Sequence, residues 1–120
     1  HPFFQVSINS NKLDMMVLMR SNDLGCATNM NCVYYALLTM VLAKATGYTP
    51  GRLTFVINDA HIYPDHLKNI KTQINRYSYE SPTVEISDRL IGSDLKDLKY
   101  DDFTLKNYTY HPSLKYEMTL

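Results

Sequence analysis

The feature that most constrains the fold of this 120-residue chain is a run of apolar side chains at helical spacing near its centre, followed by a glycine. The run predicts one long helix over residues 31–46, because side chains three and four positions apart lie on the same helical face. Gly47 is the expected C-cap, since glycine readily takes the left-handed conformation at which many helices end. The apolar positions at this spacing are Val33, Ala36, Leu37, Met40 and Val41.

Two strand-forming segments precede that helix. Residues 2–8 and 12–20 are both rich in apolar side chains, and the sequence Asn9-Ser10-Asn11 between them has turn chemistry. This arrangement predicts an antiparallel hairpin with a short loop. The second segment is almost continuously apolar, so we expect both faces of that strand to be buried.

The rest of the chain predicts shorter elements. Pro50-Gly51 indicates a turn before a strand at 52–58, and a second helix is expected from about Pro64. Its apolar face would hold Leu67, Ile70 and Ile74. Short strands are expected at 82–87 and around Phe103, Tyr108 and Leu114. Strands and two main helices in mixed order predict an α+β fold with a mixed or antiparallel sheet, as a single domain over residues 1–120.

Charge and cysteine content favour a neutral cytoplasmic protein. The chain has 12 basic and 12 acidic residues, which gives no electrostatic reason to expect nucleic acid or a membrane surface as a partner. It has no apolar run long enough to span a membrane, and its start does not resemble a secretory signal. Neither Cys26 and Cys32 nor His61 and His66 have a common zinc-ligand spacing, so we expect free thiols and no metal site.

Three short polar segments carry side chains suited to binding. Arg20 and Ser21, at a strand end, can hold a phosphate, although the same segment also suits a solvated strand end. Asn31 offers a donor and an acceptor that match a pyrimidine edge, or it is the N-cap of the helix. His61, between a strand and a helix, is either a binding group or a structural histidine.

The three segments occur together in the string RSNDLGCATNMNCVYYALLTMVLAKATGYTPGRLTFVINDAHIY. This string resembles the thymidylate synthase signature of Arg-Ser-x-Asp, a helix start with Asn, Tyr-Ala-Leu-Leu, a Pro-Gly turn and Asp-x-His-x-Tyr. The ending DDFTLKNYTYHPSLKYEMTL resembles the end of the same family. The whole chain is therefore similar to the C-terminal part of the thymidylate synthase fold.

The resemblance implies reductive methylation of dUMP to dTMP, with 5,10-methylenetetrahydrofolate as cosubstrate and no metal. On the nucleotide side, it assigns the phosphate to Arg20 and Ser21. It assigns the uracil edge to Asn31, which also belongs to the catalytic set. It assigns the 3′-hydroxyl of the deoxyribose to His61 and Tyr63.

On the folate side, the resemblance assigns Asp23 to the pterin and places Ala27 where the family has a glycine. Leu120 matches the end of the tail that closes over bound ligands, a role typical of a lid that excludes water. His1 matches the histidine that follows the nucleophilic cysteine, so the cysteine is expected immediately before His1. The family forms homodimers whose active sites borrow residues from the neighbouring subunit, so this segment should not catalyse alone.

Departures from the family pattern leave two alternatives open. Met19 stands where the family usually has Gln, and the string Met-Arg-Ser-Asn-Asp resembles the related pyrimidine hydroxymethylases. The cytidylate enzyme of that group has Asp at the base-reading position, so Asn31 favours a uracil base. The second alternative is a non-catalytic nucleotide-binding protein, which would lack the upstream cysteine.

Overall fold

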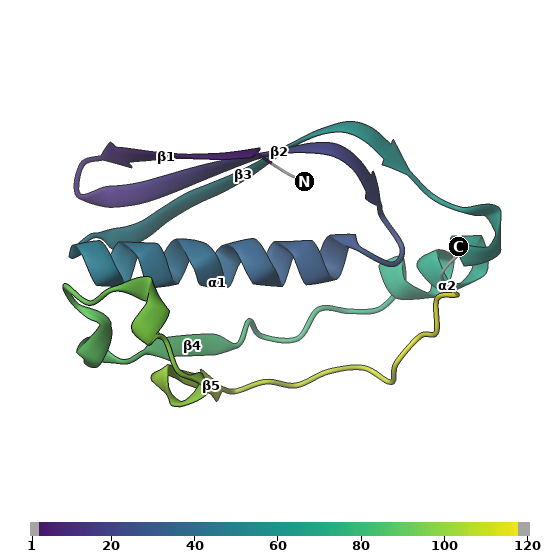
Figure 1. Ribbon diagram of the computed structural model, residues 1–120. Helices are drawn as coiled ribbons and strands as arrows, with labels where there is room; N and C mark the ends of the chain where they lie inside the picture. Colours follow the sequence, from purple (N-terminus) through teal and green to yellow (C-terminus); the bar gives the residue numbers. More distant parts are fainter. Residues whose placement is uncertain (1–2, 118–120) are drawn as a thin grey trace.

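The computed structural model describes residues 3–117, so the predictions for His1 and Leu120 fall outside the described range. A twisted sheet lies on one side of a long central helix, and extended chain lies on the other side (Figure 1). The strands are β1 (Phe3–Asn9), β2 (Lys12–Asp23), β3 (Thr49–His61), β4 (Thr83–Ile86) and β5 (Phe103–Lys106). The helices are α1 (Thr28–Thr46) and α2 (Leu67–Ile74), with short 3-10 turns at Pro64–His66, Asp88–Leu90, Leu95–Asp97 and Tyr100–Asp102.

The predicted hairpin is confirmed. β1 and β2 pair antiparallel from Phe3 opposite Leu18 to Asn9 opposite Lys12. The two turn residues, Ser10 and Asn11, have φ values of 48° and 64°. Positive φ at both central residues matches the right-handed twist of a two-residue hairpin, so local turn chemistry determines this connection.

The main sheet is mixed, as predicted, with strand order β1-β2-β3. β2 and β3 run parallel, from Lys12 beside Thr49 to Asp23 beside His61. Parallel neighbours need a crossover connection, and α1 supplies it. The same ends of β2 and β3 therefore meet at one edge of the sheet, next to the N-terminus of α1 (Figure 1).

The prediction that β2 is buried on both faces is wrong. Over residues 13–19 only alternate residues are buried, because α1 covers one face of the sheet and no described element covers the other. On the outer face Met16 and Leu18 remain 37% and 45% exposed. The buried residues of β2 are Leu13, Met15, Val17, Met19 and Asn22.

The predicted turn at Pro50-Gly51 is also wrong, because both residues lie inside β3. β3 is an edge strand of this sheet, where proline is tolerated near the strand start. The pairing with β2 shifts register between Leu13 and Met15, and a Cβ on Gly51 would lie 2.9 Å from the Leu13 carbonyl oxygen. The glycine therefore permits close strand contact at an irregularity of the ladder.

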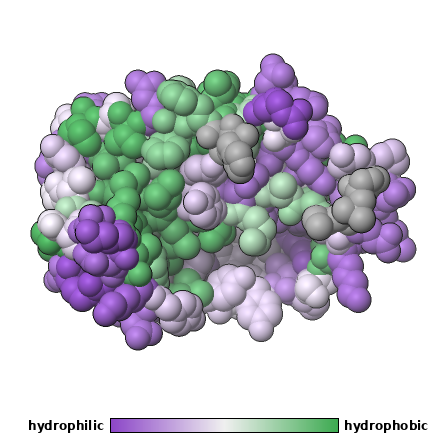
Figure 2. Space-filling view, in the orientation of Figure 1, coloured by the Kyte–Doolittle hydropathy of each residue, from purple (hydrophilic) through white to green (hydrophobic). Residues whose placement is uncertain are grey.

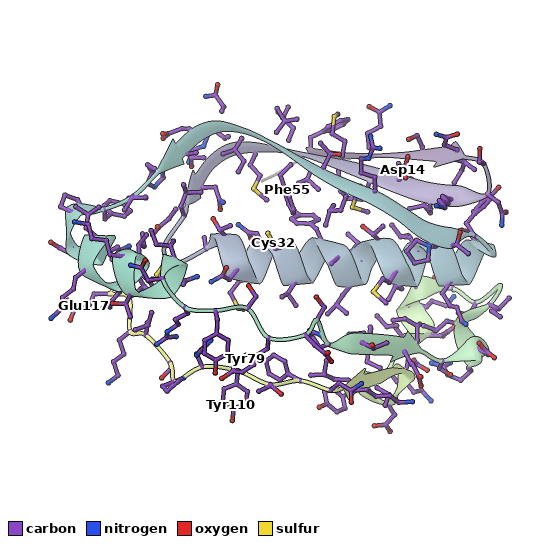
Figure 3. All side chains as sticks on the ribbon, turned by 180° about the vertical axis from the view of Figure 1, so that it is seen from behind. Asp14, Cys32, Phe55, Tyr79, Tyr110 and Glu117 are labelled. Carbon is purple, nitrogen blue, oxygen red and sulfur yellow. The ribbon has the colours of Figure 1, made fainter. Side chains whose placement is uncertain are left out.

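The long helix is confirmed, and Gly47 closes it with a φ of 78°. Not all of the apolar residues at helical spacing are buried, since Val33 is 60% exposed. Tyr35 and Thr39 face the core instead, and the Tyr35 ring packs edge-to-face on Phe55 at a centroid distance of 5.9 Å. Figure 3 shows Phe55 pointing from the sheet toward the helix. The helix is apolar around most of its circumference, so sequence periodicity did not determine which side meets the sheet.

The C-terminal third forms a second layer across α1. β4 and β5 pair antiparallel, which confirms the strands expected at 82–87 and Phe103. No strand forms around Tyr108 or Leu114, where the chain runs extended beside the segment between α2 and β4 (Figure 1). Side chains bridge these two segments in place of a backbone ladder: His111 Nε2 donates to the Tyr77 carbonyl at 2.8 Å. Arg76 likewise donates to the Pro112 carbonyl at 2.8 Å.

Many large apolar side chains are exposed to solvent. Figure 2 shows apolar side chains gathered over the sheet and α1 in the left half of the view. On the outer face of the sheet, Phe3 pairs with Leu18 and Leu18 with Val56, which forms a row of exposed apolar side chains across all three strands. Contiguous apolar patches of this kind are typical of surfaces that other protein covers. Within residues 3–117, none of the helices has the length and apolar character needed to cross a membrane.

A buried carboxylate anchors the turns after β4. Asp102 accepts hydrogen bonds from the Arg89 guanidinium, with Nε 3.0 Å away, and from the Lys99 amide at 2.7 Å. The bond with Arg89 is the main cause that holds the pKa of Asp102 below its ordinary value of 3.8, although burial acts the other way. A carboxyl whose folded pKa is depressed stabilises the fold above its unfolded pKa, and the stabilisation disappears as pH falls through the folded pKa.

We therefore expect Asp102→Asn to lower the free energy of unfolding at pH 7. We also expect the free energy of unfolding of this variant to fall less than that of the unmodified protein when the pH drops below about 4. Urea unfolding of both proteins at pH 7 and pH 3 measures the difference. Asp101→Asn, at the exposed neighbouring position, is the control and should change stability by less than about 0.5 kcal/mol at either pH. Equal acid sensitivity of Asp102→Asn and the unmodified protein would contradict the assignment.

Candidate functional site

The predicted site residues that fall within residues 3–117 lie at or near the edge where β2 and β3 end. Ser21 lies beside Asp59 and Asp23 beside His61 in the parallel register. The Leu24 amide then donates to the His61 carbonyl at 2.9 Å, which holds the two strand ends together as β2 leaves the sheet. Ligands commonly bind outside the carboxyl ends of parallel strands, so this edge is the candidate site.

Asn31 points back from α1 to the end of β2. It is not the N-cap: the helix begins at Thr28, and the Asn31 amide already donates to the Ala27 carbonyl at 2.9 Å. The side-chain Nδ2 of Asn31 donates to Oδ1 of Asn22 at 2.8 Å. In turn, Nδ2 of Asn22 donates to Thr28 Oγ1 at 2.7 Å, and this hydroxyl donates to the Asp23 carbonyl at 3.3 Å.

This chain of bonds orients the Asn31 amide. One of its two Nδ2 protons is committed to Asn22, which leaves one N–H donor and the Oδ1 acceptor for a ligand. Asn22 is itself buried, and sequence reasoning did not assign it a role. The signal was weak, since an asparagine at a strand end is ordinary turn chemistry and its partner lies nine residues away in a helix.

Arg20 and Ser21 lie at the same end of β2. Arg20 is exposed, on the opposite side of the strand from its buried neighbour Met19, and Ser21 is half-buried. An exposed guanidinium is free to take two oxygens of an anion in a fork. The geometry therefore fits either of the two roles set out for this pair.

His61 and Tyr63 form an aromatic pair at the end of β3. Their rings meet edge-to-face with centroids 5.2 Å apart, and His61 Nδ1 lies 3.6 Å from Asp59 Oδ2. His61 belongs to the strand itself and does not lie in the loop that follows it. Both side chains are partly exposed, although Nδ1 of His61 is buried, so the Tyr63 hydroxyl and His61 Nε2 are the atoms available to a ligand at this edge.

Asp23 is the last residue of β2 and lies beside His61 in the parallel register. Its Oδ1 accepts from the backbone amides of Gly25 at 2.9 Å and Cys26 at 3.2 Å, while its Oδ2 faces His66. Burial raises the pKa of Asp23, but the hydrogen bonds from Cys26 and Gly25, with the charge of His66, outweigh it and the pKa falls below its ordinary value. The half-buried Ala27 follows, and its amide donates to the Asp23 carbonyl at 3.0 Å.

A separate apolar cavity of about 350 Å³ lies on the side of α1 away from the sheet. Its wall contains no predicted site residue and offers almost no polar atoms, so it lacks the groups that binding a nucleotide requires. Its lining residues are Tyr34, Leu37, Leu38, Val41, Leu95, Leu98 and Phe103.

The chain is similar in sequence to known proteins. The thymidylate synthase family matches residues 1–120. The thymidylate synthase of Varicella-zoster virus (strain Dumas) is 38% identical over 120 residues, which is 100% of this chain and 39% of that protein. Thymidylate synthase 1/2 of Encephalitozoon cuniculi (strain GB-M1) is 33% identical over 119 residues, which is 99% of this chain and 40% of that protein.

The fold agrees as well. The solved structure of thermostable thymidylate synthase A from Bacillus subtilis superposes with a TM-score of 0.88 at 34% identity, over 96% of this chain and 41% of that one. The chain thus spans about two fifths of the length of these relatives. On sequence and on fold, the chain belongs to the thymidylate synthase family.

Proposed function

We propose that this chain is part of an enzyme that makes dTMP by reductive methylation of dUMP, with 5,10-methylenetetrahydrofolate as carbon donor and reductant. The observation that carries the proposal is the Asn22–Asn31 hydrogen bond. It leaves Asn31 with one donor and one acceptor, which complement the O4 acceptor and N3–H donor of uracil. A cytosine edge presents the reverse pattern and would be rejected.

The remaining nucleotide contacts follow from the edge of the sheet. Arg20 and Ser21 are proposed to hold the 5′-phosphate, because a guanidinium and a hydroxyl provide several donors to one anion. His61 and Tyr63, at the end of the neighbouring strand, are proposed to bind the 3′-hydroxyl. The parallel register supports this assignment. Asp23 on β2 lies beside His61 on β3, and Ser21 lies two residues before Asp23 on the same strand.

The chemistry requires a nucleophile at C6 of the uracil, because C5 becomes reactive toward the one-carbon unit only after C6 is attacked. A thiolate suits this step, since it attacks readily and can leave again. We place it immediately before His1, as the family resemblance implies. Neither Cys26 nor Cys32 is assigned this role.

The folate is proposed to bind on the Asp23 side of Asn31. Asp23 Oδ1 accepts from two backbone amides, while Oδ2, which lies 3.6 Å from His66 Nδ1, is proposed to accept from a pterin N–H. Ala27 borders the same loop, and Leu120 is assigned to the tail that closes over both ligands. A folded-state pKa below the ordinary value keeps Asp23 ionised and able to accept at neutral pH.

The exposed row on the outer face of the sheet supports a homodimer. Phe3, Leu18 and Val56 would pack against the same row of a second subunit, because sheets pack face to face through such apolar rows. Free thiols at Cys26 and Cys32 suit the reducing cytoplasm, where we place the enzyme. Residues 1–120 would then form one portion of a larger domain.

Product analysis tests the proposal. The protein expressed from its complete gene should convert dUMP and 5,10-methylenetetrahydrofolate into dTMP and dihydrofolate, identified by mass spectrometry. A reaction without folate is the control. If the only product were 5-hydroxymethyl-dUMP, which carries one more oxygen atom than dTMP, the enzyme would be a hydroxymethylase. Binding of dUMP without turnover would support a non-catalytic nucleotide-binding protein.

A further inference from the structure

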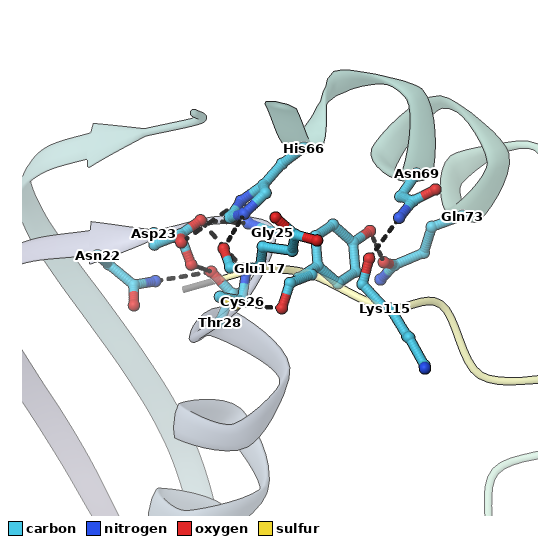
Figure 4. Close-up of polar contacts among 11 residues, drawn as sticks. Asn22, Asp23, Gly25, Cys26, Thr28, His66, Asn69, Gln73, Lys115 and Glu117 are labelled. Carbon is cyan, nitrogen blue, oxygen red and sulfur yellow. Dashed lines mark hydrogen bonds and ion pairs between the residues drawn. The ribbon is translucent and has the colours of Figure 1, made fainter. Parts of the chain in front are cut away.

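Three potential metal ligands meet beside the candidate site. The side chains of Asp23, Cys26 and His66 come from the end of β2, the loop before α1 and the 3-10 turn before α2. One ligand atom from each lies within 4.8 Å of the others. Figure 4 shows His66 above the Asp23 carboxylate with the loop that carries Cys26 next to both. Sequence spacing missed this group, because His66 lies 40 residues from Cys26.

His66 points an unpartnered nitrogen into this cluster. The side chain is 2% exposed, and its Nε2 lies 2.7 Å from the backbone carbonyl oxygen of Glu117. A carbonyl oxygen only accepts hydrogen bonds, so Nε2 carries the proton and a neutral ring presents a lone pair at Nδ1. Nδ1 has no hydrogen-bond partner within residues 3–117 and lies 3.6 Å from Asp23 Oδ2.

We propose that Asp23, Cys26 and His66 bind one zinc-like divalent cation. A thiolate, an imidazole and a carboxylate form a mixed donor set typical of zinc, whereas magnesium and calcium prefer oxygen ligands only. Zinc ligands about 2.0–2.3 Å from the metal lie roughly 3.5 Å apart, so movements of about 1 Å would close the site. Water completes the coordination.

The surroundings already hold two of the ligands in place. Metal-binding histidines usually donate their second nitrogen to a carbonyl or carboxylate, as His66 does to Glu117. Asp23 Oδ1 accepts from the Gly25 and Cys26 amides, which orients Oδ2 toward the centre of the cluster. The competing arrangement is a protonated His66 that forms an ion pair with Asp23, and metal titration separates the two.

Binding of Co²⁺ to the protein expressed from its complete gene tests the site. Co²⁺ replaces Zn²⁺ in such sites, and its bond to a thiolate adds a charge-transfer absorption band in the near ultraviolet. We expect the unmodified protein to show this band and Zn²⁺ to displace it. Cys26→Ser should abolish the band, while Cys32→Ser, at an exposed cysteine outside the cluster, should keep it.

A second variant tests the carboxylate. Asn at position 23 can still accept from the two backbone amides, so Asp23→Asn should keep the fold and the cobalt–thiolate band while Co²⁺ affinity falls at least tenfold. Thermal unfolding of each variant shows whether it folds. No band in the unmodified protein would overturn the site in favour of the ion pair. A band that survives in Cys26→Ser would place the metal elsewhere.

One consequence rests on the proposed function. Because Asp23 is also assigned to the pterin, Zn²⁺ should inhibit dTMP formation in competition with folate, and Cys26→Ser should relieve that inhibition. The Co²⁺ titration needs no substrate, so it stands if the proposed reaction fails. Loss of competition with an intact cobalt band would leave the metal site in place and remove Asp23 from the folate site.

Discussion

Asn31→Asp is expected to reverse the base preference of the enzyme, with the ratio of kcat/KM for dUMP over dCMP falling by on the order of 10²–10³-fold. The amide offers uracil a donor and an acceptor, whereas a carboxylate offers only acceptors and suits the amino group of cytosine. Asn22 can follow the change by turning its own amide toward the new carboxylate, at the cost of its 2.7 Å bond to Thr28.

Competition between the two nucleotides in one reaction, with both products quantified by mass spectrometry, measures this ratio. The matched control is Asn29→Asp, which makes the same chemical change at an exposed position two residues away in α1. That variant should leave the ratio within about twofold, since surface changes away from the ligand have small effects. An unchanged ratio in Asn31→Asp would remove Asn31 as the base reader.

The second large effect is expected at the phosphate. Arg20→Ala should weaken dUMP binding by about 1.5–3 kcal/mol, which is roughly 10- to 150-fold in Kd, because it removes a charge-assisted contact. Binding of deoxyuridine, which has no phosphate, should be unchanged. Calorimetric titration of both ligands therefore separates a phosphate contact from a general loss of the site.

Lys12→Ala is the matched control for this experiment. Lys12 is also exposed and also lies on β2, but at the opposite end of the strand, so its loss removes the same charge far from the site. We expect its effect on dUMP affinity to be less than about threefold, since solvent and salt screen distant charges. If both variants weakened dUMP binding equally, the effect would be a long-range charge effect. If Arg20→Ala weakened the binding of dUMP and deoxyuridine equally, the substitution would have damaged the structure of the site.

The elements that sequence predicted correctly are those that adjacent residues determine. Ser10 and Asn11 accept positive φ, so the hairpin forms where they stand. Gly47 accepts the left-handed conformation, so α1 ends there. Proline is compatible with the first turn of a helix, so the 3-10 turn that leads into α2 begins at Pro64.

The wrong predictions share a different cause. β2 was expected to be buried on both faces and Pro50-Gly51 to be a turn, yet both outcomes depend on which strands and helices become neighbours. For the same reason, the apolar residues of α1 did not indicate which side of the helix meets the sheet. A run of apolar residues indicates that burying the segment is favourable, but it does not determine which strand or helix covers the segment.

The candidate site divides in the same way. Motif order by itself indicated the family and predicted Arg20, Asp23, Asn31 and His61 as candidate site residues. Only the tertiary structure decided that Asn31 bonds to Asn22, which fixes the orientation of the amide, and that His66 lies beside Asp23 and Cys26, which are 43 and 40 residues away in the sequence. Neighbouring residues determine short-range conformational preferences. Contacts between side chains that are distant in the sequence form only when the parallel strands and the crossover helix pack together.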